Sequence, residues 1–378
     1  MNKDILVVIV SLNRGGAEIH LSQVLPGLVA KGMKVKVFLL SEPGELADQI
    51  ESQGVGLVLP WVRKKFGNSL LKVLKILLNS FQLFLYLLFK RPHIVHFFLP
   101  QTYLVGGLLS WMARNPVRLM SRRSLNLYLN KYPEIVRKIE YWLHAKMTCI
   151  IGNSRKVVTQ LIEEEGVPKE KAHLIYNGIY LKKSQDIDLK ATFGVSEESV
   201  ILVMVANLIP YKGHVDLISA LSKVLTSLRW DLLLIGNDSS NIREALEAQA
   251  ATENIGDRVH FLGKRSDVVD ILSHCDIGIL ASHEEGFSNA ILEGMGSGLP
   301  MVVTDVGGNA EAIIDQECGL VVPAKAPDKI AVALNQLIES EALRREFGQA
   351  AKARFEAHFQ LENCVQAYFD FYQGHFDK

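Results

Sequence analysis

Two glutamates, Glu285 and Glu293, lie eight positions apart and enclose a glycine turn and the start of an apolar helix. Ser288 or Asn289 can cap this helix, because their side-chain oxygens accept hydrogen bonds from its first N–H groups. Those N–H groups and the positive end of the helix dipole favour a phosphate. Carboxylates only accept hydrogen bonds and therefore suit the hydroxyls of a sugar or a ribose. The segment predicts a phosphate site between two hydroxyl-binding side chains, which is the chemical outline of a nucleotide-sugar.

The composition is that of a folded globular protein. Of its 378 residues, 48% are hydrophobic and 22% are charged, and this length allows two domains of common size. The first apolar run is too short for the hydrophobic region of a signal peptide. The four cysteines form no C-x-x-C pair and indicate reduced thiols in a cytosolic protein; they are Cys149, Cys275, Cys318 and Cys364.

The formal net charge of zero conceals a charge difference between the two parts of the chain. Residues 1–150 carry 20 Lys and Arg and 8 Asp and Glu, a formal charge of +12, and residues 151–378 carry −12. The basic part predicts an anionic partner, either a membrane surface or a phosphate-bearing acceptor. Nucleic acid is not predicted, because no recognition motif for it is present. The alternative is two solvated surfaces that favour docking with each other. The basic clusters are Arg63-Lys64-Lys65, Arg114 to Arg123 and Arg137-Lys138.

Short apolar, β-branched runs alternate with helical patterns along the whole chain. Such runs predict parallel sheets that are covered by helices on both faces. A polar stretch at 181–199 separates two series of runs, so we predict an α/β protein with two doubly wound Rossmann-like domains facing a cleft. The predicted parts are an acceptor-binding domain at 1–180, a linker at 181–199, a nucleotide-sugar-binding domain at 200–358, and a C-terminal helix at 359–378 crossing back to the first domain. A single long helix is expected over 341–371. The predicted strands are 5–10, 35–40, 94–97, 118–121, 148–152, 173–176, 200–206, 230–235, 259–262, 277–280 and 301–304.

Residues 70–89 form an unusually apolar helical segment. Its polar side chains recur at spacings of three and four and make one narrow stripe, and all its other residues are apolar. A membrane span needs ~20 mostly apolar residues, so the segment is marginally long enough, but two lysines in the stripe argue against spanning. We expect a helix packed on the sheet, with surplus apolar surface that contacts a membrane or a partner, or with plain burial as the alternative. The stripe is Lys72, Lys75, Asn79, Gln82 and Tyr86.

The motifs resemble those of a known family. Residues 282–300 contain the two glutamates and a glycine-rich helix end before a proline, and residues 303–311 contain a Gly-Gly-x-x-Glu loop. Together they resemble the retaining GT-B glycosyltransferases of family 4, also called glycosyl transferases group 1, and the resemblance extends over essentially the full length. It implies retaining, metal-independent transfer of a hexose-type sugar, and no H-E-x-x-H spacing is present. The implied donor-binding residues are Gly15, Gly16, Asn207, Lys212, Glu285, Phe287, Ser288, Asn289, Ala290 and Glu293.

Two further stretches extend the implied donor site. Gly15 and Gly16 follow the first predicted strand and open a helix, where the resemblance implies contact with the donor diphosphate. Residues 206–214 resemble the family's G-R-x-x-x-x-K-G stretch, in which an arginine and a lysine neutralise that diphosphate. Lys212 matches the lysine, but Asn207 stands in place of the arginine and supplies neither its charge nor its fork of donors. Arg14 or Arg265 could compensate.

The first domain offers weaker candidates. His96 matches a histidine that the family places near the acceptor, and Phe98 stands where a second histidine is usual. A role for His96 in proton handling is one reading, and a hydrogen-bonded structural histidine is the other. Arg122 and Arg123 follow a predicted strand and could bind a phosphate-linked acceptor, with a solvated basic loop as the alternative.

The predicted enzyme moves a sugar from a nucleotide diphosphate sugar, with UDP favoured and GDP possible, to a lipid-linked or envelope oligosaccharide or polysaccharide. Lys212, Glu285 and His96 are the catalytic candidates; no cofactor or metal is expected, and the nucleotide-sugar is a co-substrate. The expected location is cytoplasmic and peripheral, on the inner face of the plasma membrane, through the basic N-terminal part and residues 63–91. The alternatives are a catalytically weak GT-B scaffold that binds nucleotide-sugar at the membrane and a nucleotide-sugar epimerase of related fold.

Overall fold

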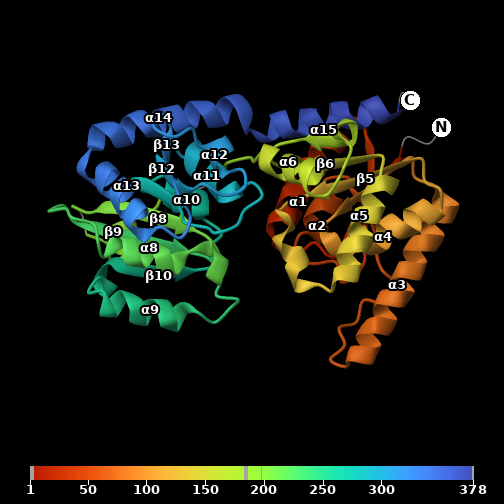
Figure 1. The fold of residues 1–378 in the computed structure, drawn as a ribbon, viewed down its shortest axis with the longest axis horizontal. Coiled ribbons are helices and arrows are strands. Elements are labelled where there is room, and N and C mark those ends of the chain that lie inside the picture. Colours follow the sequence, from red (N-terminus) through yellow and green to blue (C-terminus); the bar gives the residue numbers. More distant parts are fainter. Residues whose placement is uncertain (1–3, 183–185, 197, 377–378) are drawn as a thin grey trace. The chain divides into compact units, whose positions relative to one another are not determined.

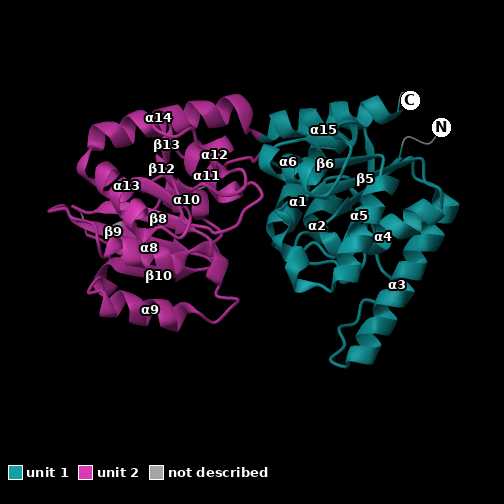
Figure 2. Ribbon diagram, viewed as in Figure 1, with its two compact units in different colours: residues 1–178, 361–378 teal, residues 179–360 magenta. Residues whose placement is uncertain are grey.

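The structure, a computed structural model, describes residues 4–182, 186–196 and 198–376 (Figure 1). The chain divides into two compact units (Figure 2). Unit 1 consists of residues 1–178 and 361–378, and unit 2 consists of residues 179–360. The stretch 181–199, predicted as a linker, therefore groups with unit 2 and contains the short helix α7 (Leu189–Phe193).

Unit 1 is built on a seven-stranded parallel sheet in the order β3-β2-β1-β4-β5-β6-β7. Successive residues of a strand point to opposite faces, and β1 shows this directly: Ile5, Val7 and Ile9 pack in one apolar cluster, and Leu6 and Val8 in another. Both faces are therefore buried. The strands are β1 (Asp4–Ile9), β2 (Lys34–Leu39), β3 (Gly56–Val58), β4 (Ile94–Phe98), β5 (Val117–Arg122), β6 (Cys149–Gly152) and β7 (Ala172–Leu174).

The helices of unit 1 cover both faces of this sheet. α15 lies against α1, where Gly27 leaves room for Val365: a Cβ at Gly27 would lie 2.7 Å from a methyl carbon of Val365. The helices are α1 (Gly16–Ala30), α2 (Ala47–Ser52), α3 (Ser69–Lys90), α4 (Pro100–Met112), α5 (Glu134–Lys146), α6 (Arg155–Glu163) and α15 (Leu361–Phe376), with 3₁₀ turns η1 (Asn126–Lys131) and η2 (Lys169–Lys171).

Unit 2 repeats the plan with a six-stranded parallel sheet in the order β10-β9-β8-β11-β12-β13. Its strands are β8 (Val200–Val205), β9 (Trp230–Ile235), β10 (Val259–Gly263), β11 (Ile277–Leu280), β12 (Met301–Thr304) and β13 (Gly319–Val322). Its further helices are α8 (His214–Leu221), α9 (Arg243–Thr252), α10 (Val268–Leu272), α11 (Asn289–Gly296), α12 (Asn309–Ala312), α13 (Pro327–Glu339) and α14 (Glu341–His358), with 3₁₀ turns η3 (Pro210–Lys212) and η4 (Gly256–Arg258). The predicted doubly wound α/β architecture is confirmed.

The predicted single helix over 341–371 is wrong. The chain leaves the helical conformation at Phe359, which caps α14, and α15 begins at Leu361. The interruption is anchored, because Ile179 N donates to Phe359 O at 3.1 Å and Ile179 pairs with Gln360 in an isolated bridge. The helical periodicity on either side gave no sign of this two-residue break.

α3 turns its polar stripe toward the body of unit 1. Asn79 and Gln82 are buried and hydrogen-bond to backbone groups of Leu40 and of residues 59–62 at 2.7–3.1 Å. Lys75 Nζ donates to a carboxylate oxygen of Glu42 at 2.9 Å. The expected packing on the sheet holds for the C-terminal part of the helix, where Leu83 and Leu87 join the core and Phe84 and Tyr86 pack against it. The expected surplus of apolar surface is present along the rest of the helix.

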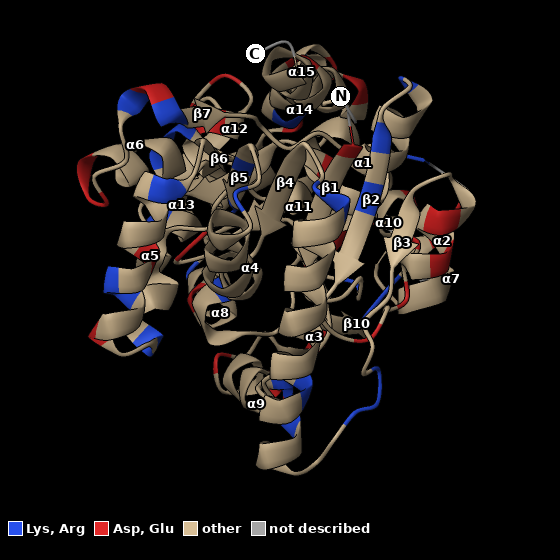
Figure 3. Cartoon of the chain, turned by 90° about the vertical axis from the view of Figure 1, so that its right-hand side faces the viewer, with Lys and Arg blue, Asp and Glu red and all other residues tan. Residues whose placement is uncertain are grey.

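The apolar side of α3 is exposed instead. The helix projects from the rest of unit 1 (Figure 1). Most of it is tan in Figure 3, the colour of residues other than Lys, Arg, Asp and Glu. By length and composition alone, it is long and apolar enough to cross a membrane. Its exposed large apolar side chains are Leu70, Leu71, Val73, Leu74, Ile76, Leu77, Leu78, Phe81, Leu88 and Phe89.

Candidate functional site

Lys212 is held at the carboxyl end of the unit 2 sheet by a tight turn after β8. Gly213, which follows it, has a φ of 75°, and a Cβ there would lie 1.9 Å from the carbonyl oxygen of Ala281. Only glycine therefore lets this turn approach the end of β11 so closely. The backbone N–H of His283 donates to Tyr211 O at 2.7 Å and joins the two loops.

Lys212 and Glu285 form an ion pair there. Lys212 Nζ lies 2.5 Å from Glu285 Oε1, and the two side chains are 18% and 11% exposed. Ser282 Oγ donates to the same carboxylate oxygen at 2.7 Å. Sequence reasoning missed Ser282; its signal is a hydroxyl residue two positions after the end of β11 and three positions before Glu285. The pair joins two predicted site residues from loops 73 positions apart.

The glycine loop after β12 closes over the same segment. Gly307 has a φ of 53°, and a Cβ there would lie 2.1 Å from the carbonyl oxygen of Glu285. Gly308 N donates to Gly286 O at 2.8 Å, and Thr304 Oγ1 donates to Ser282 O at 2.6 Å. The backbone on both sides of Glu285 is thus fixed by β12 and the loop that follows it.

The start of α11 lies directly after this segment. Ser288 occupies the N-cap position with an extended backbone, but its side chain makes no capping hydrogen bond, so the predicted side-chain cap at Ser288 is wrong. Asn289 and Ala290 form the first turn. Phe287 is buried, with its ring 5.5 Å from that of Phe359, so its side chain serves packing. The Ser288 side chain therefore leaves this helix N-terminus uncapped, and the N-terminus of a helix favours an anion.

Glu293 lies one turn further along α11. Burial raises the pKa of its carboxyl from its usual range to about 7. Within the described residues its carboxyl has no hydrogen-bond or ion-pair partner. A partly buried carboxyl without a partner gains from binding hydroxyl donors, so its predicted role toward a ribose remains chemically reasonable.

Asn207 contributes a turn contact rather than a charge. Its side chain is exposed, and its Oδ1 accepts from Asn237 N at 3.0 Å. The two arginines that could replace the missing charge are both engaged: Arg14 lies 3.4 Å from Glu45, and Arg265 pairs with Asp267 at 2.5 Å. Of the three cationic candidates, Lys212 is the one that pairs with another predicted site residue, Glu285.

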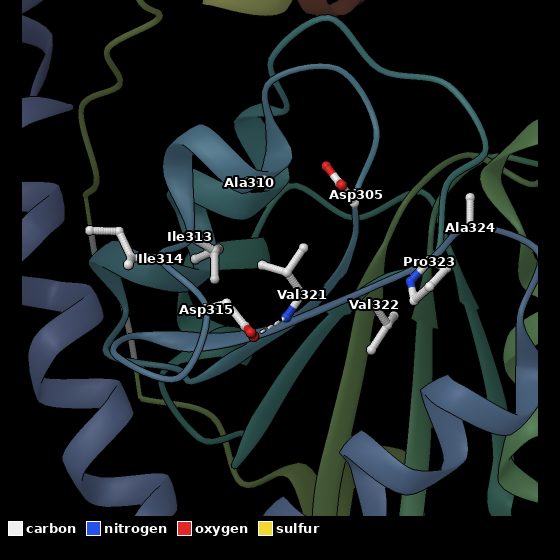
Figure 4. A pocket seen from close by; sticks show the side chains of 9 residues that line it. All are labelled: Asp305, Ala310, Ile313, Ile314, Asp315, Val321, Val322, Pro323 and Ala324. Atoms are coloured by element: carbon white, nitrogen blue, oxygen red, sulfur yellow. Dashed lines mark hydrogen bonds between the residues drawn. The ribbon is translucent and has the colours of Figure 1, made fainter.

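Two hollows lie beside strands of the unit 2 sheet. One of about 210 Å³ is lined by residues of β9, β10, α9 and the loops after β8 and β9, and the Arg243 guanidinium lies 5.4 Å from the Phe261 ring centre. The other, of about 560 Å³, lies beside α12 and β13 (Figure 4). The side chains drawn around it are apolar except for Asp305 and Asp315, whose carboxylates would repel a diphosphate.

The predicted glycine loop of unit 1 lies at the start of α1. Gly15 is the N-cap residue, and a Cβ there would lie 2.5 Å from a carboxylate oxygen of Glu18, whereas a Cβ at Gly16 would meet nothing within 4 Å. Burial raises the pKa of Glu18, and the charge of Arg123 opposes this shift. Arg123 Nη2 donates to Asn177 Oδ1 at 2.8 Å. Arg123 therefore lies near the glycine loop and is already engaged.

His96 is fully buried in unit 1. Its Nδ1 lies 2.7 Å from the Tyr372 hydroxyl and its Nε2 lies 2.8 Å from Ser121 Oγ. Burial, helped by the charge of Arg123, lowers the pKa of His96 to about 3. Both ring nitrogens are occupied and the ring stays neutral, so the structure favours the structural reading over proton transfer.

Arg122 is not available to an acceptor, which corrects the prediction for this residue. Its guanidinium is buried and contacts Glu140 at 2.7 Å and Glu165 at 2.8 Å. His144 Nε2 lies 2.8 Å from Glu165. Glu140, His144 and Glu165 place their ligand atoms within 4.8 Å of one another, as metal ligands do. The Arg122 guanidinium takes the position of a cation there, so the cluster is an ion network that joins β5 to α5.

Comparison with known protein families matches almost the whole chain. Residues 14–183 match the family described as Glycosyltransferase Family 4, and residues 186–354 match Glycosyl transferases group 1. The chain belongs to the family 4 glycosyltransferases.

Curated relatives of this glycosyltransferase include two bacterial enzymes. It is 31% identical over 205 residues, 53% of each chain, to N-acetyl-alpha-D-glucosaminyl L-malate synthase of Bacillus anthracis. It is 26% identical over 369 residues, 93% of this chain and 94% of the relative, to the N-acetylgalactosamine-N,N'-diacetylbacillosaminyl-diphospho-undecaprenol 4-alpha-N-acetylgalactosaminyltransferase of Campylobacter jejuni.

Solved structures show the same fold. Anabaena Alr3699/HepE, in a complex described as containing UDP and glucose, superposes with a TM-score of 0.83 at 20% identity and covers 99% of this glycosyltransferase and 100% of its own chain. At that identity the likeness supports the GT-B fold alone. The roles of the individual site residues remain predictions.

Proposed function

We propose that this glycosyltransferase moves a hexose-type sugar from a UDP-sugar to a lipid-linked or envelope oligosaccharide acceptor, with GDP-sugars as the second choice of donor. The Anabaena structure is described as containing UDP and glucose, which supports a UDP donor. The C. jejuni relative is named for a diphospho-undecaprenol acceptor, which supports a lipid-linked acceptor.

The observation that carries the proposal is the pairing of Lys212 with Glu285 beside the uncapped start of α11. The Lys212 ammonium and the first N–H groups of α11 would stabilise the negative charge that develops as the diphosphate departs. Glu285, fixed by Ser282 and Lys212, would accept hydrogen bonds from hydroxyls of the donor sugar. Glu293 would accept those of the ribose.

The proposed reaction breaks the bond between the sugar C1 and the diphosphate oxygen, and the electron pair leaves with UDP. The acceptor oxygen forms the new bond to C1, and its proton passes to the departing phosphate. This proton route, proposed with retention of configuration, fits the chain's own groups, because His96 is buried with both ring nitrogens bonded. Metal independence is part of the proposal, with Lys212 and backbone N–H groups neutralising the phosphates.

We propose that unit 1 binds an anionic membrane surface from the cytoplasmic side. α4 packs between α3 and α5, and all three helices expose large apolar side chains. Trp111 of α4 and Trp142 of α5 lie edge to face at 5.2 Å, with Lys146 Nζ within 5.8 Å of both rings. Aromatic rings beside lysines are typical of the membrane interface. The loop before α3 adds Arg63, Lys64 and Lys65 as charges that complement anionic lipid.

Donor binding and turnover test the enzymatic proposal in sequence. A thermal-shift screen of UDP-, GDP- and ADP-sugars identifies the nucleotide, and release of that nucleotide is then followed with lipid-linked acceptors. The proposal expects a shift with a UDP-sugar and acceptor-dependent UDP release. A shift with none of these nucleotides would contradict it.

The second candidate is a nucleotide-sugar-binding scaffold without efficient catalysis. Asn207 favours it, because this side chain brings no positive charge and its oxygen already bonds to Asn237 N. Binding of a UDP-sugar without UDP release, tested over a panel of acceptors, would favour the scaffold. Turnover that depends on Lys212 would exclude it.

A further inference from the structure

Unit 1 contains a large hollow that no predicted site residue lines. Its volume is about 800 Å³, within the usual range of small-molecule sites. It lies at the carboxyl ends of β1 and β2, the edge at which parallel α/β sheets bind ligands. Its walls come from the inner side of α3, the first turns of α4, the loop before α3, and Tyr132 before α5.

The lining combines apolar surface with positive charge. The charged residues of the lining are three lysines and one glutamate, Glu42, so the lining has a net charge of +2. The lysines are Lys65, Lys72 and Lys75, and the apolar lining residues are Val10, Leu40, Phe66, Ile76, Leu104 and Val105.

Glu42 holds two of these lysines in place. Lys75 Nζ lies 2.9 Å and Lys65 Nζ 3.5 Å from its carboxylate oxygens, and Ser41 Oγ also donates to it. The hydrogen bonds from Ser41 and Lys75 lower the pKa of Glu42 to about 2, so it remains ionised at physiological pH. Lys75 is the close partner of Glu42, whereas Lys65 lies farther from it and its side chain is 81% exposed, so Lys65 and Lys72 are the lysines that can meet an incoming anion.

This combination selects a class of ligand. A hydroxyl-rich soluble glycan gains little from an apolar wall, and a free inorganic phosphate gains nothing from it. A diphosphate diester between a sugar and a lipid carries two negative charges, which equal the net charge of the lining. Its apolar chain fits the six apolar lining residues, and α3, which forms one wall, exposes apolar side chains on its other side.

We propose that this hollow binds the head of the lipid-linked acceptor, an amphiphile in which a diphosphate follows directly on an isoprenoid-type chain. Lys65 and Lys72 contact the diphosphate, Phe66 and Ile76 contact the first part of the chain, and Lys75 positions Glu42 and the loop around it. The inference rests on the proposed function and adds the acceptor subsite, which replaces the one predicted at Arg122.

Matched variants test the charge. Lys65→Gln and Lys72→Gln each remove a lining charge and leave Glu42 paired with Lys75. Lys64→Gln removes a charge from the neighbouring exposed position, outside the lining. The probe is farnesyl diphosphate, titrated by calorimetry below its micelle concentration. Each lining variant should bind it about five- to tenfold more weakly, as expected for one charge-assisted contact, and Lys64→Gln should bind it like the wild type.

A second pair of variants tests the chain. Ile76→Asn changes a lining residue, and Leu77→Asn changes the adjacent residue outside the lining; the two are 55% and 61% exposed, so neither change removes much packing. Ile76→Asn should weaken binding of farnesyl diphosphate and leave binding of inorganic diphosphate unchanged. Leu77→Asn should change neither.

Several results would overturn the inference. The first is wild-type affinity for farnesyl diphosphate in both Lys65→Gln and Lys72→Gln, and the second is an equal loss of that affinity in Lys64→Gln. The third is inorganic diphosphate that binds as tightly as farnesyl diphosphate. The fourth is lysophosphatidylglycerol that binds as tightly as farnesyl diphosphate and depends on the same lysines. UDP binding, measured in parallel, separates the two proposals. If the protein binds UDP but its binding of farnesyl diphosphate does not depend on the lysines, only the acceptor subsite is refuted. If the wild type does not bind UDP, only the donor assignment is refuted.

Discussion

The ion pair between Lys212 and Glu285 gives the sharpest prediction. Lys212→Met removes the ammonium and keeps most of the side-chain volume. If this ammonium stabilises the departing diphosphate, its loss should lower turnover roughly 10²–10³-fold, the effect of removing one preorganised electrostatic contact. The assay is UDP release per enzyme under saturating donor and acceptor.

The same substitution also affects stability. Removing one partner of a fully buried ion pair costs about 3–5 kcal/mol. Here water reaches both side chains, which are 18% and 11% exposed, and Ser282 still donates to Glu285. We therefore expect a loss nearer 2 kcal/mol in the free energy of unfolding, about half that range, measured by chemical denaturation.

The double variant Lys212→Met/Glu285→Gln separates the two effects. It leaves no unpaired charge, so stability should return to near the wild-type value and turnover should stay low. Glu285→Gln alone should lower turnover and leave affinity for UDP unchanged, because Glu285 is proposed to contact the sugar. Recovery of turnover together with stability in the double variant would refute the reasoning, since the pair would then be structural only.

Three further predictions concern donor binding, the loop geometry and the membrane. The pKa of Glu293 is raised to about 7, so its carboxyl loses its proton as pH rises through neutrality. The affinity for UDP, measured by calorimetry, should therefore rise from about pH 6 to about pH 8 more steeply in the wild type than in Glu293→Gln, in which only the titration of UDP itself remains. Equal slopes would contradict the role of Glu293. Gly307→Ala should lower thermal stability and UDP affinity far more than Gly298→Ala. Both glycines have a positive φ, but a Cβ at Gly307 would lie 2.1 Å from Glu285 O, whereas a Cβ at Gly298 would lie 4.0 Å from Lys352 Cδ. Similar losses in the two variants would refute the close approach at Gly307. Leu77→Glu should reduce co-flotation with phosphatidylglycerol vesicles severalfold, as expected for a charge placed in an apolar membrane-contacting surface. Leu225→Glu, which changes an exposed leucine of unit 2, should not reduce it. Equal flotation of both variants would show that α3 does not contact the membrane.

The parallel sheets could be predicted because their strands are short and most of them are apolar and buried on both faces. Two edge strands escaped prediction: β3 has only three residues, and β13 begins with a glycine directly after a turn. Both are added at the margins of their sheets, where the pattern of burial is weakest.

The site in unit 2 was predictable where a motif combines chemistry with a turn. Lys212 and Glu285 were both named from the sequence, but their direct contact depends on how closely Gly213 and Gly307 let the loops approach, which no local pattern states. Ser282 was missed for the same reason, because its role exists only through Glu285.

The first unit shows what sequence patterns do not decide. Arg122 resembled a phosphate-binding arginine at a strand end, yet partners 18 and 43 positions away bury it in an ion network. The polar stripe of α3 could have faced either way, and it faces inward because Asn79 and Gln82 hydrogen-bond to backbone groups of Leu40 and of residues 59–62. Long-range partners therefore decide whether a polar residue is structural or available to a ligand.

The most direct test of the account is a transfer assay followed by mass spectrometry. The purified full chain is incubated with UDP-glucose, UDP-galactose and their N-acetylated forms, and with short-chain isoprenoid diphosphates carrying one sugar. The account predicts that one UDP-sugar adds a single sugar to the acceptor, with one UDP released per product, and that Lys212→Met abolishes most of this transfer. Binding of a UDP-sugar with no acceptor product under any of these conditions, or transfer that is indifferent to Lys212, would contradict it.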